Sequence, residues 1–168
     1  MFRNIDVGTY ECNPFNEISK THFLVTAGDE NGFNTMTAGW GGYGVMWYKN
    51  IAVSVIRPTR YTKKFVDENE YFSMCFFGED KKDAVAYCGV NSGRDVDKCK
   101  ECNLTPVFDK AAPYFAEAKK VIICKKVYVD EIKPDKFLDA SLDDKWYPLK
   151  DYHTVYAGEI VEILVNDK

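Results

Sequence analysis

The chain has 168 residues, of which 46% are hydrophobic and 15% aromatic, and its formal net charge at pH 7 is −4. This composition supports a folded core and argues against disorder, while the acidic balance argues against a nucleic-acid partner. A chain of this length is most simply one domain, so we expect residues 1–168 to fold together. No apolar run approaches ~20 residues and no signal-peptide pattern opens the chain, so we expect a cytoplasmic protein with no membrane contact.

The first half of the chain predicts strands joined by short turns. Residues 23–27 and 33–37 have strand-like composition, and the pair Asn31-Gly32 between them is a strong hairpin signal. Residues 51–56 are apolar on both alternating faces, as in a central strand, and Pro58 ends that run.

Helical patterns then alternate with one further strand. Residues 60–68 have helical spacing, and residues 71–77 return as a strand. Residues 80–88 predict a second helix, with Asp80 as its N-cap and Gly89 as its stop.

A capping box and a long polar excursion mark the second half. Residues 92–95 resemble a capping box, so we expect a third helix from there to about Cys102. Residues 121–129 and 154–165 are strongly strand-like, and the polar segment 130–151 carries large aromatic residues, which indicates a docked flap rather than a linker. Because the β segments follow one another without regular helical crossovers, we expect an antiparallel barrel with appended helices.

Two clusters about twenty residues apart suggest a site for a planar ring that carries a phosphate. Residues 34–37 and Trp40 offer an amide, hydroxyls, backbone groups and a flat ring, as a bound flavin ring would need. Arg57, Arg60 and the hydroxyls of Thr59 and Thr62 surround the start of the helix 60–68, which suits a phosphate. Taken alone, the first cluster is better explained as an ordinary hairpin arm. The second is equally well explained as an ordinary capped helix whose arginines pair with surface acids.

Three other features are less specific. The glycine-rich residues 39–44 lack the lysine and the βαβ context of a nucleotide-binding loop, so a tight turn near a ligand or a second subunit is the better interpretation. Arg94 and Lys98 lie one helical turn apart and either face a phosphate or form a solvated helix face. His153 opens the last long strand, and His22 is a weaker candidate.

The pair Cys99 and Cys102 forms a CxxC motif, but no second CxxC or paired histidine completes a tetrahedral zinc site. The pair also falls at the end of the helix expected from residue 92, where the helix dipole does not favour a thiolate. We therefore expect small thiols that face the core and no metal.

The ordered motifs of the chain resemble those of the flavin reductase-like family, in its flavoredoxin-type branch. The resemblance rests on residues 34–42, 56–62, 88–98 and 104–108 and on residues 152–161 near the end, and it runs in order from about Asn13 to Val165. One departure is Gly39, where similar sequences often carry a serine, so the hydroxyl is missing at this position.

This resemblance implies an antiparallel Greek-key split β-barrel that binds FMN, usually as a homodimer with the flavin near the subunit interface. It makes His153 a candidate catalytic residue in the environment of the nicotinamide or the flavin ring. It implies that the FMN contacts come from the following residues: Asn34, Thr35, Met36, Thr37, Trp40, Arg57, Arg60, Tyr61, Thr62, Ser92, Arg94 and Lys98.

The function expected from the sequence is that of an FMN-dependent oxidoreductase, with NADH or NADPH as donor and a small molecule or a protein as electron acceptor. Two alternatives remain open: an FMN electron carrier of flavoredoxin type that a partner protein reduces, and a cysteine-based metal-binding or redox module. The sequence carries no dinucleotide fingerprint that would distinguish NADH from NADPH.

Overall fold

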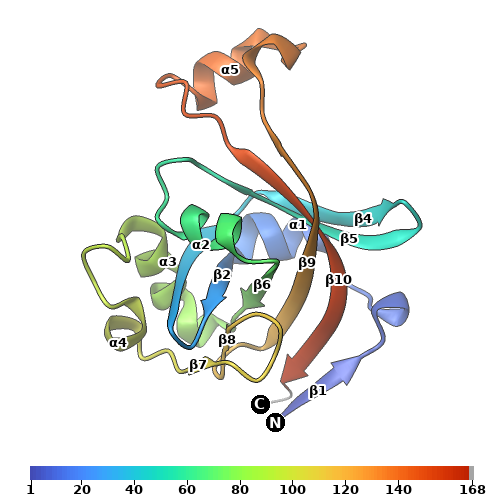
Figure 1. Ribbon diagram of the computed structural model, residues 1–168, viewed down its shortest axis with the longest axis vertical. Helices are drawn as coiled ribbons and strands as arrows, with labels where there is room; N and C mark the ends of the chain where they lie inside the picture. The colour runs from blue at the N-terminus through green and yellow to red at the C-terminus, as the bar shows by residue number, and fades with distance from the viewer. Residues whose placement is uncertain (167–168) are drawn as a thin grey trace.

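An antiparallel β-sheet that coils on itself forms the centre of the molecule (Figure 1). The computed structural model describes residues 1–166. The strands of this eight-stranded sheet are β1 (Phe2–Ile5), β2 (Phe23–Asp29), β3 (Gly32–Ala38), β4 (Gly41–Met46), β5 (Lys49–Ile56), β6 (Tyr71–Phe76), β9 (Lys120–Glu131) and β10 (Thr154–Asn166). Their order is β3-β2-β6-β9-β10-β5-β4, with β1 paired to β10 outside this path.

Short helices and one small hairpin surround the sheet. The helices are α1 (Pro14–Asn16), continued by a π-helical turn (Glu17–Thr21), α2 (Thr62–Glu68), α3 (Lys82–Val90), α4 (Lys98–Cys102) and α5 (Ala140–Trp146). Single 3₁₀ turns lie at Val7–Thr9, Glu79–Lys81 and Pro134–Lys136, and β7 (Pro106–Val107) pairs with β8 (Tyr114–Phe115). No helix within residues 1–166 is long and apolar enough to cross a membrane.

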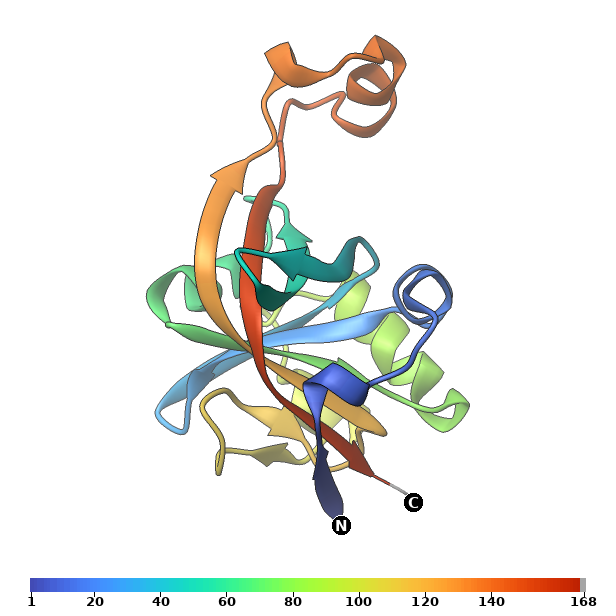
Figure 2. The same cartoon turned by 90° about the vertical axis from the view of Figure 1, so that its right-hand side faces the viewer.

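The long strands β9 and β10 run side by side and are joined by the segment that carries α5, which stands above the barrel (Figure 2). Their pairing shifts register at Ala157/Gly158 and again at Ile160/Glu162, and such bulges bend and twist a strand. Gly158 is required at the first bend, because a Cβ there would lie 2.7 Å from the Cβ of Cys124.

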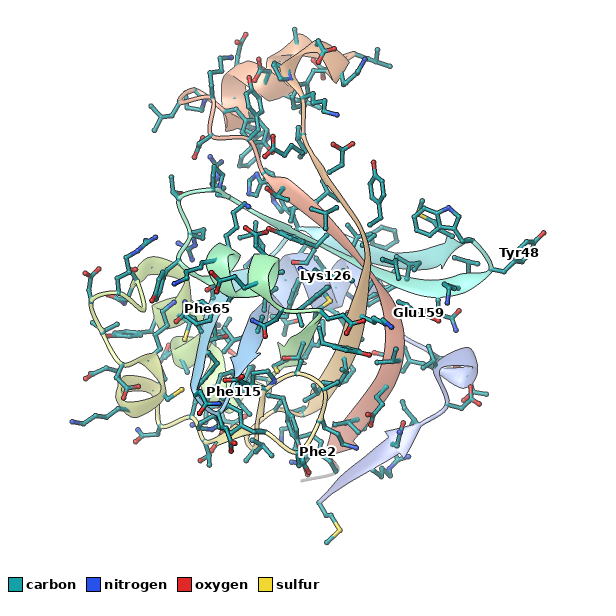
Figure 3. The ribbon with its side chains drawn as sticks, in the orientation of Figure 1. Phe2, Tyr48, Phe65, Phe115, Lys126 and Glu159 are labelled. Atoms are coloured by element: carbon teal, nitrogen blue, oxygen red, sulfur yellow. The ribbon has the colours of Figure 1, made fainter. Side chains whose placement is uncertain are left out.

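Two hydrophobic clusters lie on opposite faces of the sheet, because successive side chains of a strand alternate in direction. Val25 and Phe72 belong to the cluster inside the barrel, whereas Leu24 and Cys75 belong to the cluster beneath α3 and β8. Helix α2 is held to the sheet by Lys126 of β9, which reaches toward it (Figure 3) and donates to the carbonyl oxygen of Asp67 at 2.9 Å.

The strands predicted from the sequence are confirmed. The expected strands 23–27, 33–37, 51–56, 71–77, 121–129 and 154–165 correspond to β2, β3, β5, β6, β9 and β10. The mainly antiparallel β architecture with a few appended helices is confirmed as well. The prediction missed β1, β4, the β7–β8 hairpin, helix α5 and the short helices before β2.

The helix predicted from residue 92 to Cys102 is wrong in its first half. Ser92 accepts from the backbone N–H of Arg94 at 3.2 Å and closes a turn instead of a helix. The helix begins only after Asp97, whose side chain accepts from the backbone N–H groups of Cys99 and Lys100, and it ends at Asn103 in the left-handed region. Serine and aspartate both favour the N-cap position, and here Asp97 rather than Ser92 starts the helix.

Three smaller predictions also need correction. Helix α2 begins at Thr62 rather than at residue 60. Helix α3 begins at Lys82 rather than after Asp80, and it runs through Gly89 to Val90.

The glycine-rich residues form strand β4 rather than a tight turn, with the turn displaced to Trp47 and Tyr48 at φ 53° and 55°. Gly41 can pair so closely with β5 only because it lacks a Cβ, which would lie 2.1 Å from the carbonyl oxygen of Val53.

Candidate functional site

A cavity of about 360 Å³ opens where the coiled sheet brings β3 close to β5. We call it the larger cavity, to distinguish it from an adjacent cavity of about 80 Å³. Met36 and Thr37 of β3 form one wall, and Val55 of β5 forms the opposite wall. The complete lining is His22, Met36, Thr37, Ala38, Gly39, Trp40, Val55, Arg57, Arg60, Gly89, Trp146 and His153. The lining therefore combines flat rings with two arginines, and among the described residues it includes no carboxylate.

Aromatic side chains form the outer rim of the larger cavity. Trp40 packs edge-to-face on Trp146, with ring centroids 5.1 Å apart, and its ring also lies 4.9 Å from that of His153. Trp40 nevertheless remains 38% exposed, so a flat face is available to a ligand. This arrangement suits a planar ring system.

His153 is fixed by a buried tyrosine. The Tyr147 hydroxyl lies 2.8 Å from Nδ1 of His153, and both residues are buried. Burial lowers the pKa of His153 to about 4, so the imidazole is neutral at pH 7. Burial raises the pKa of Tyr147, so the phenol keeps its proton. If the phenol donates to Nδ1, the imidazole proton lies on Nε2.

Arg57 holds the flap that follows β9. Its Nη1 donates to Oδ2 of Asp151 at 2.6 Å, and its Nη2 donates to the carbonyl oxygen of Trp146 at 2.8 Å. The guanidinium also lies 5.3 Å from the centroid of the Tyr147 ring. Arg57 thus borders the larger cavity while its donors fix the base of the flap.

Arg60 lies between the larger cavity and a second, smaller one of about 80 Å³. Arg60 and Met36 line both hollows, so the two are adjacent. The Nη2 of Arg60 donates to the carbonyl oxygen of Gly89 at 2.6 Å, which directs the guanidinium toward the C-terminal end of α3. Burial lowers its pKa, which still leaves an arginine charged at neutral pH.

The smaller cavity is built from the turn before α2 and the loop after α3. Its lining comprises Asn34, Met36, Thr59, Arg60, Tyr61, Thr62, Val90, Asn91, Ser92, Gly93 and Lys98. Asn34 donates from Nδ2 to Oγ1 of Thr62 at 2.9 Å, with both residues buried. A Cβ at Gly93 would lie 2.1 Å from Oδ1 of Asn34, so the loop can approach β3 only with glycine at this position.

Lys98 is a buried cation at the wall of the smaller cavity. Its Nζ donates to the carbonyl oxygens of Thr35 at 2.8 Å and Cys88 at 3.0 Å, and the residue is only 5% exposed. Burial lowers its pKa. Lys98 thereby joins β3, α3 and α4 at one point.

A third hollow of about 300 Å³ extends the smaller cavity outward over α2. Arg60 and Tyr61 line both hollows, and Lys63, Lys64 and Arg94 add positive charge beside Asp67 and Glu68. The guanidinium of Arg94 lies 4.6 Å from the centroid of the Tyr61 ring. Arg94 and Lys98 do not share a helix face, which corrects the expected one-turn spacing, because Arg94 lies in the loop and Lys98 begins α4.

Most residues predicted for the site come together around these three hollows, but not all side chains are free to contact a ligand. The Oγ1 of Thr35 lies on the face of the sheet opposite to Met36, where it bonds to Oγ1 of Thr26 at 2.8 Å and donates to the Val25 carbonyl oxygen. Thr37 lines the larger cavity, yet its hydroxyl bonds to the carbonyl oxygen of Val85.

The sequence interpretation missed Trp146, Gly89 and Asn91 and gave little weight to His22. Trp146 had a signal as one of the aromatic residues in the expected flap, and Gly89 and Asn91 lie within the segment 88–98 that contributes to the family resemblance. His22 lies beside Gly39, and a Cβ at Gly39 would lie 2.3 Å from Cδ2 of His22. The histidine ring therefore occupies space that a side chain at position 39 would need.

Cys99 and Cys102 pack on the core as expected, although the helix boundary from which the dipole effect was inferred is wrong. Cys99 lies in the first turn of α4 rather than at the end of a long helix. Burial nevertheless raises its pKa to about 11, so no thiolate is favoured there. In residues 1–166 no group of three or more His, Cys, Asp or Glu side chains is placed to hold a metal ion.

Comparison with solved structures identifies split-barrel flavoproteins as similar in fold. Flavoredoxin of Desulfovibrio vulgaris (Miyazaki F) matches with a TM-score of 0.67 and 22% identity over 97% of this chain and 76% of that chain. An FMN-binding domain of a flavin reductase-like enzyme from Shewanella baltica OS155 matches with a TM-score of 0.69 and 14% identity, over 98% of this chain and 77% of that one.

A NADH:FAD oxidoreductase of Streptomyces globisporus C-1027 has a TM-score of 0.64 and 16% identity over 87% of this chain and 75% of that one. A protein of Shewanella frigidimarina NCIMB 400 that is described as a putative flavin reductase with split barrel domain has a TM-score of 0.68 and 17% identity over 89% of this chain and 68% of that one. At these identities the likeness concerns the fold, and it confirms the expected split barrel.

No curated protein sequence matches the chain significantly. The family model for the flavin reductase like domain, by contrast, matches residues 15–168, which is most of the chain. The chain therefore belongs to the flavin reductase-like family.

Proposed function

We propose that this protein binds FMN across the larger and smaller cavities and passes electrons from NADH or NADPH through it to an acceptor. The observation that carries the proposal is the adjacency of an aromatic-rimmed hollow and a cationic one, joined at Met36 and Arg60. A flavin mononucleotide has the same two parts, a planar ring and a phosphate.

The phosphate end fits the smaller cavity and its outward extension. Arg60 and Arg94 supply guanidinium groups, and the turn before α2 supplies the hydroxyls of Thr59 and Tyr61. Arginine makes charge-assisted bonds to phosphate oxygens, and Gly93 lets the backbone of the loop approach closely. Arg57 is assigned to the flap instead, because its donors already bond to Asp151 and Trp146.

The ring end fits the larger cavity. Trp40 and His153 offer flat faces, and the β3 residues Met36 to Ala38 offer an apolar and backbone surface. Bound FMN supplies the hydride and electron chemistry, whereas the protein supplies binding, orientation and electrostatics. Neutral His153, fixed by Tyr147, presents a hydrogen-bonding group that does not add a positive charge at pH 7.

The alternative is an FMN electron carrier that a partner protein reduces. The contact between Trp40 and Trp146 favours it, because these two rings of the cavity lining already pack on one another where a nicotinamide would need an aromatic face. A carrier needs only close approach of a partner, whereas a reductase needs room for the nicotinamide.

Two simple measurements test these proposals. Purified protein loaded with FMN should show flavin absorbance bands after gel filtration, and their absence would contradict FMN binding. Anaerobic addition of NADH or NADPH should then bleach the flavin at a catalytic rate. Slow bleaching, together with rapid reduction by a low-potential protein donor, would support the carrier instead.

The proposal includes a homodimer that buries the β4–β5 hairpin. This hairpin extends from the barrel with Tyr48 at its tip (Figure 3), and Val45, Met46, Trp47 and Tyr48 are between 48% and 104% exposed. Tyr128 of β9 continues this apolar surface, since its ring centroid lies 6.1 Å from that of Trp47. Exposed apolar surface of this kind is typical of an interface. Sedimentation should give a dimer that Trp47→Glu dissociates, whereas a monomeric wild type would contradict this assignment.

A further inference from the structure

Cys102 of the CxxC motif lies close to a cysteine outside the motif, Cys88. The Sγ atoms of Cys88, on α3, and Cys102, at the end of α4, lie 4.0 Å apart. A disulfide has an S–S distance of about 2.05 Å, so a displacement of about 2 Å would join them. The contact joins a residue of α3 to a residue of α4, so the spacing of the CxxC motif does not reveal it.

The other cysteines are less well placed for such a bond. Cys75 and Cys124 are fully buried in the sheet, and Cys12 is exposed near the N-terminus. Cys99 is half-buried and packs on the core beneath α4. The pair Cys88 and Cys102 is therefore distinguished by proximity across two elements.

We propose that Cys88 and Cys102 form a reversible disulfide that constrains the loop between α3 and α4. The half-buried Cys102 would react first with a small disulfide, because Cys88 is fully buried. The Cys102 thiolate attacks one sulfur of the small disulfide, breaks its S–S bond and releases one small thiolate. The Cys88 thiolate then attacks the Cys102 sulfur and releases the second small thiolate, and both leaving groups take up the protons that the two cysteines lost.

Burial limits the rate of this exchange. It raises the pKa of Cys102, and it raises that of Cys88 to about 12. Only a small fraction of either thiol is ionised at neutral pH, so a mildly alkaline buffer of about pH 9 is the suitable condition for a test.

The segment that the disulfide would close contains the wall of the proposed FMN site. Gly89 lines the larger cavity, and Asn91, Ser92, Gly93 and Lys98 line the smaller one, all between the two cysteines. The Cys88 carbonyl oxygen also accepts from Lys98 at 3.0 Å, which connects the pair directly to the cavity wall. A cross-link restricts the conformations of the loop it closes. A loop fixed in its ligand-bound form releases a ligand more slowly.

The chemical part of the inference is tested by mapping disulfides. Native protein is incubated with oxidised glutathione at about pH 9, alkylated without reduction and digested. We expect a cross-linked peptide that contains Cys88 and Cys102, retained in Cys99→Ser and lost in Cys102→Ser. A cross-link between Cys99 and Cys102, or glutathione adducts alone, would overturn the pairing.

The expected effect of the disulfide on FMN release rests on the proposed function and is measured in a separate experiment. We expect the oxidised, FMN-loaded protein to release FMN about fivefold more slowly than the reduced protein, with no such difference in Cys102→Ser. An unchanged or faster release from protein with the mapped cross-link would overturn the constraint on the loop. If the protein binds no FMN in either state, the proposed function fails, while the mapped cross-link still decides the pairing.

Discussion

Arg57 and Asp151 are joined by a 2.6 Å ion pair between residues 94 positions apart in the chain. This pair, together with the bond from Arg57 to the Trp146 carbonyl oxygen, ties the segment after β9 to the rim of the larger cavity. The side chains of Arg57 and Asp151 are only 29% and 17% exposed, so water competes weakly for the pair. The flap that carries α5 is thus fixed at its base, while most of it stands clear of the barrel (Figure 1).

Breaking that ion pair should loosen the flap. In Asp151→Asn the carboxylate is lost with little change in shape, and we expect limited proteolysis within residues 132–150 to become faster by about fivefold or more. Lys49→Gln is the matched control, because it breaks the exposed pair with Glu159 far from the flap. Equal cleavage rates in Asp151→Asn and wild type would show that the flap is held by its aromatic contacts alone.

The two glycines nearest to polar side chains of the site should respond differently to substitution. Gly93→Ala places a Cβ 2.1 Å from the buried Oδ1 of Asn34, whose amide is bonded to Thr62, so we expect a loss of about 1–3 kcal/mol in unfolding free energy. Gly39→Ala meets the ring of the exposed His22, which can swing away, so the loss should stay below about 1 kcal/mol.

Urea denaturation measures both glycine variants. Gly44→Ala serves as the control, because no atom lies within 4 Å of the Cβ it introduces. A Gly93→Ala variant as stable as this control would mean that the loop after α3 is not tightly packed against β3.

The neutral state of His153 makes stability depend on pH. The folded-state pKa of about 4 lies below the ordinary value of 6.5, so the unfolded chain binds more protons between these values and stability falls as pH drops from about 6.5 to 4. The loss attributable to this residue is roughly 2–3 kcal/mol at the lower end. Thermal unfolding of wild type and His153→Gln between pH 4 and 7 should show a smaller pH dependence in the variant. Parallel curves would contradict a buried, neutral His153.

Lys98 should affect the cavity through its charge and its two hydrogen bonds. Lys98→Met keeps the apolar stem but leaves the carbonyl oxygens of Thr35 and Cys88 without their donor, which should cost about 1–3 kcal/mol of stability. We also expect FMN to bind more weakly or its midpoint potential to become more negative, as redox titration can measure. An unchanged affinity together with an unchanged potential would limit Lys98 to a structural role.

The sequence predicted the strands well because their signals are local. Residues 51–56 and 121–129 are dense in β-branched side chains, and Asn31-Gly32 marks the first hairpin directly. Strand β4 was missed because three of its residues are glycines, which have low strand propensity, and because its turn uses Trp47 and Tyr48 at positive φ. The helix was predicted to start at Ser92 because serine is a favoured N-cap residue. Asp97, five residues later, is an equally suitable N-cap, and it is the residue that starts α4.

Side-chain partners in the site were harder to predict because they depend on distant segments. Arg57 is an obvious phosphate candidate until the fold brings Asp151 to it. Lys98 is an obvious free cation until burial directs its ammonium group to two carbonyl oxygens. None of the three partners, Asp151, Thr35 and Cys88, is separated from its cation by one helical turn or by two strand positions, so no pattern in the sequence reveals the pairings.

The central claim is that FMN occupies the joined cavities with its phosphate near Arg60. Equilibrium titration of the flavin-free protein with FMN, followed by flavin fluorescence, tests it most directly in wild type, Arg60→Ala and the control Lys110→Gln, which breaks the ion pair with Glu162 outside the three hollows. The account predicts binding in the wild type and the control, and an affinity lower by about tenfold or more in Arg60→Ala. An Arg60→Ala variant that folds and binds FMN as tightly as the wild type would contradict it.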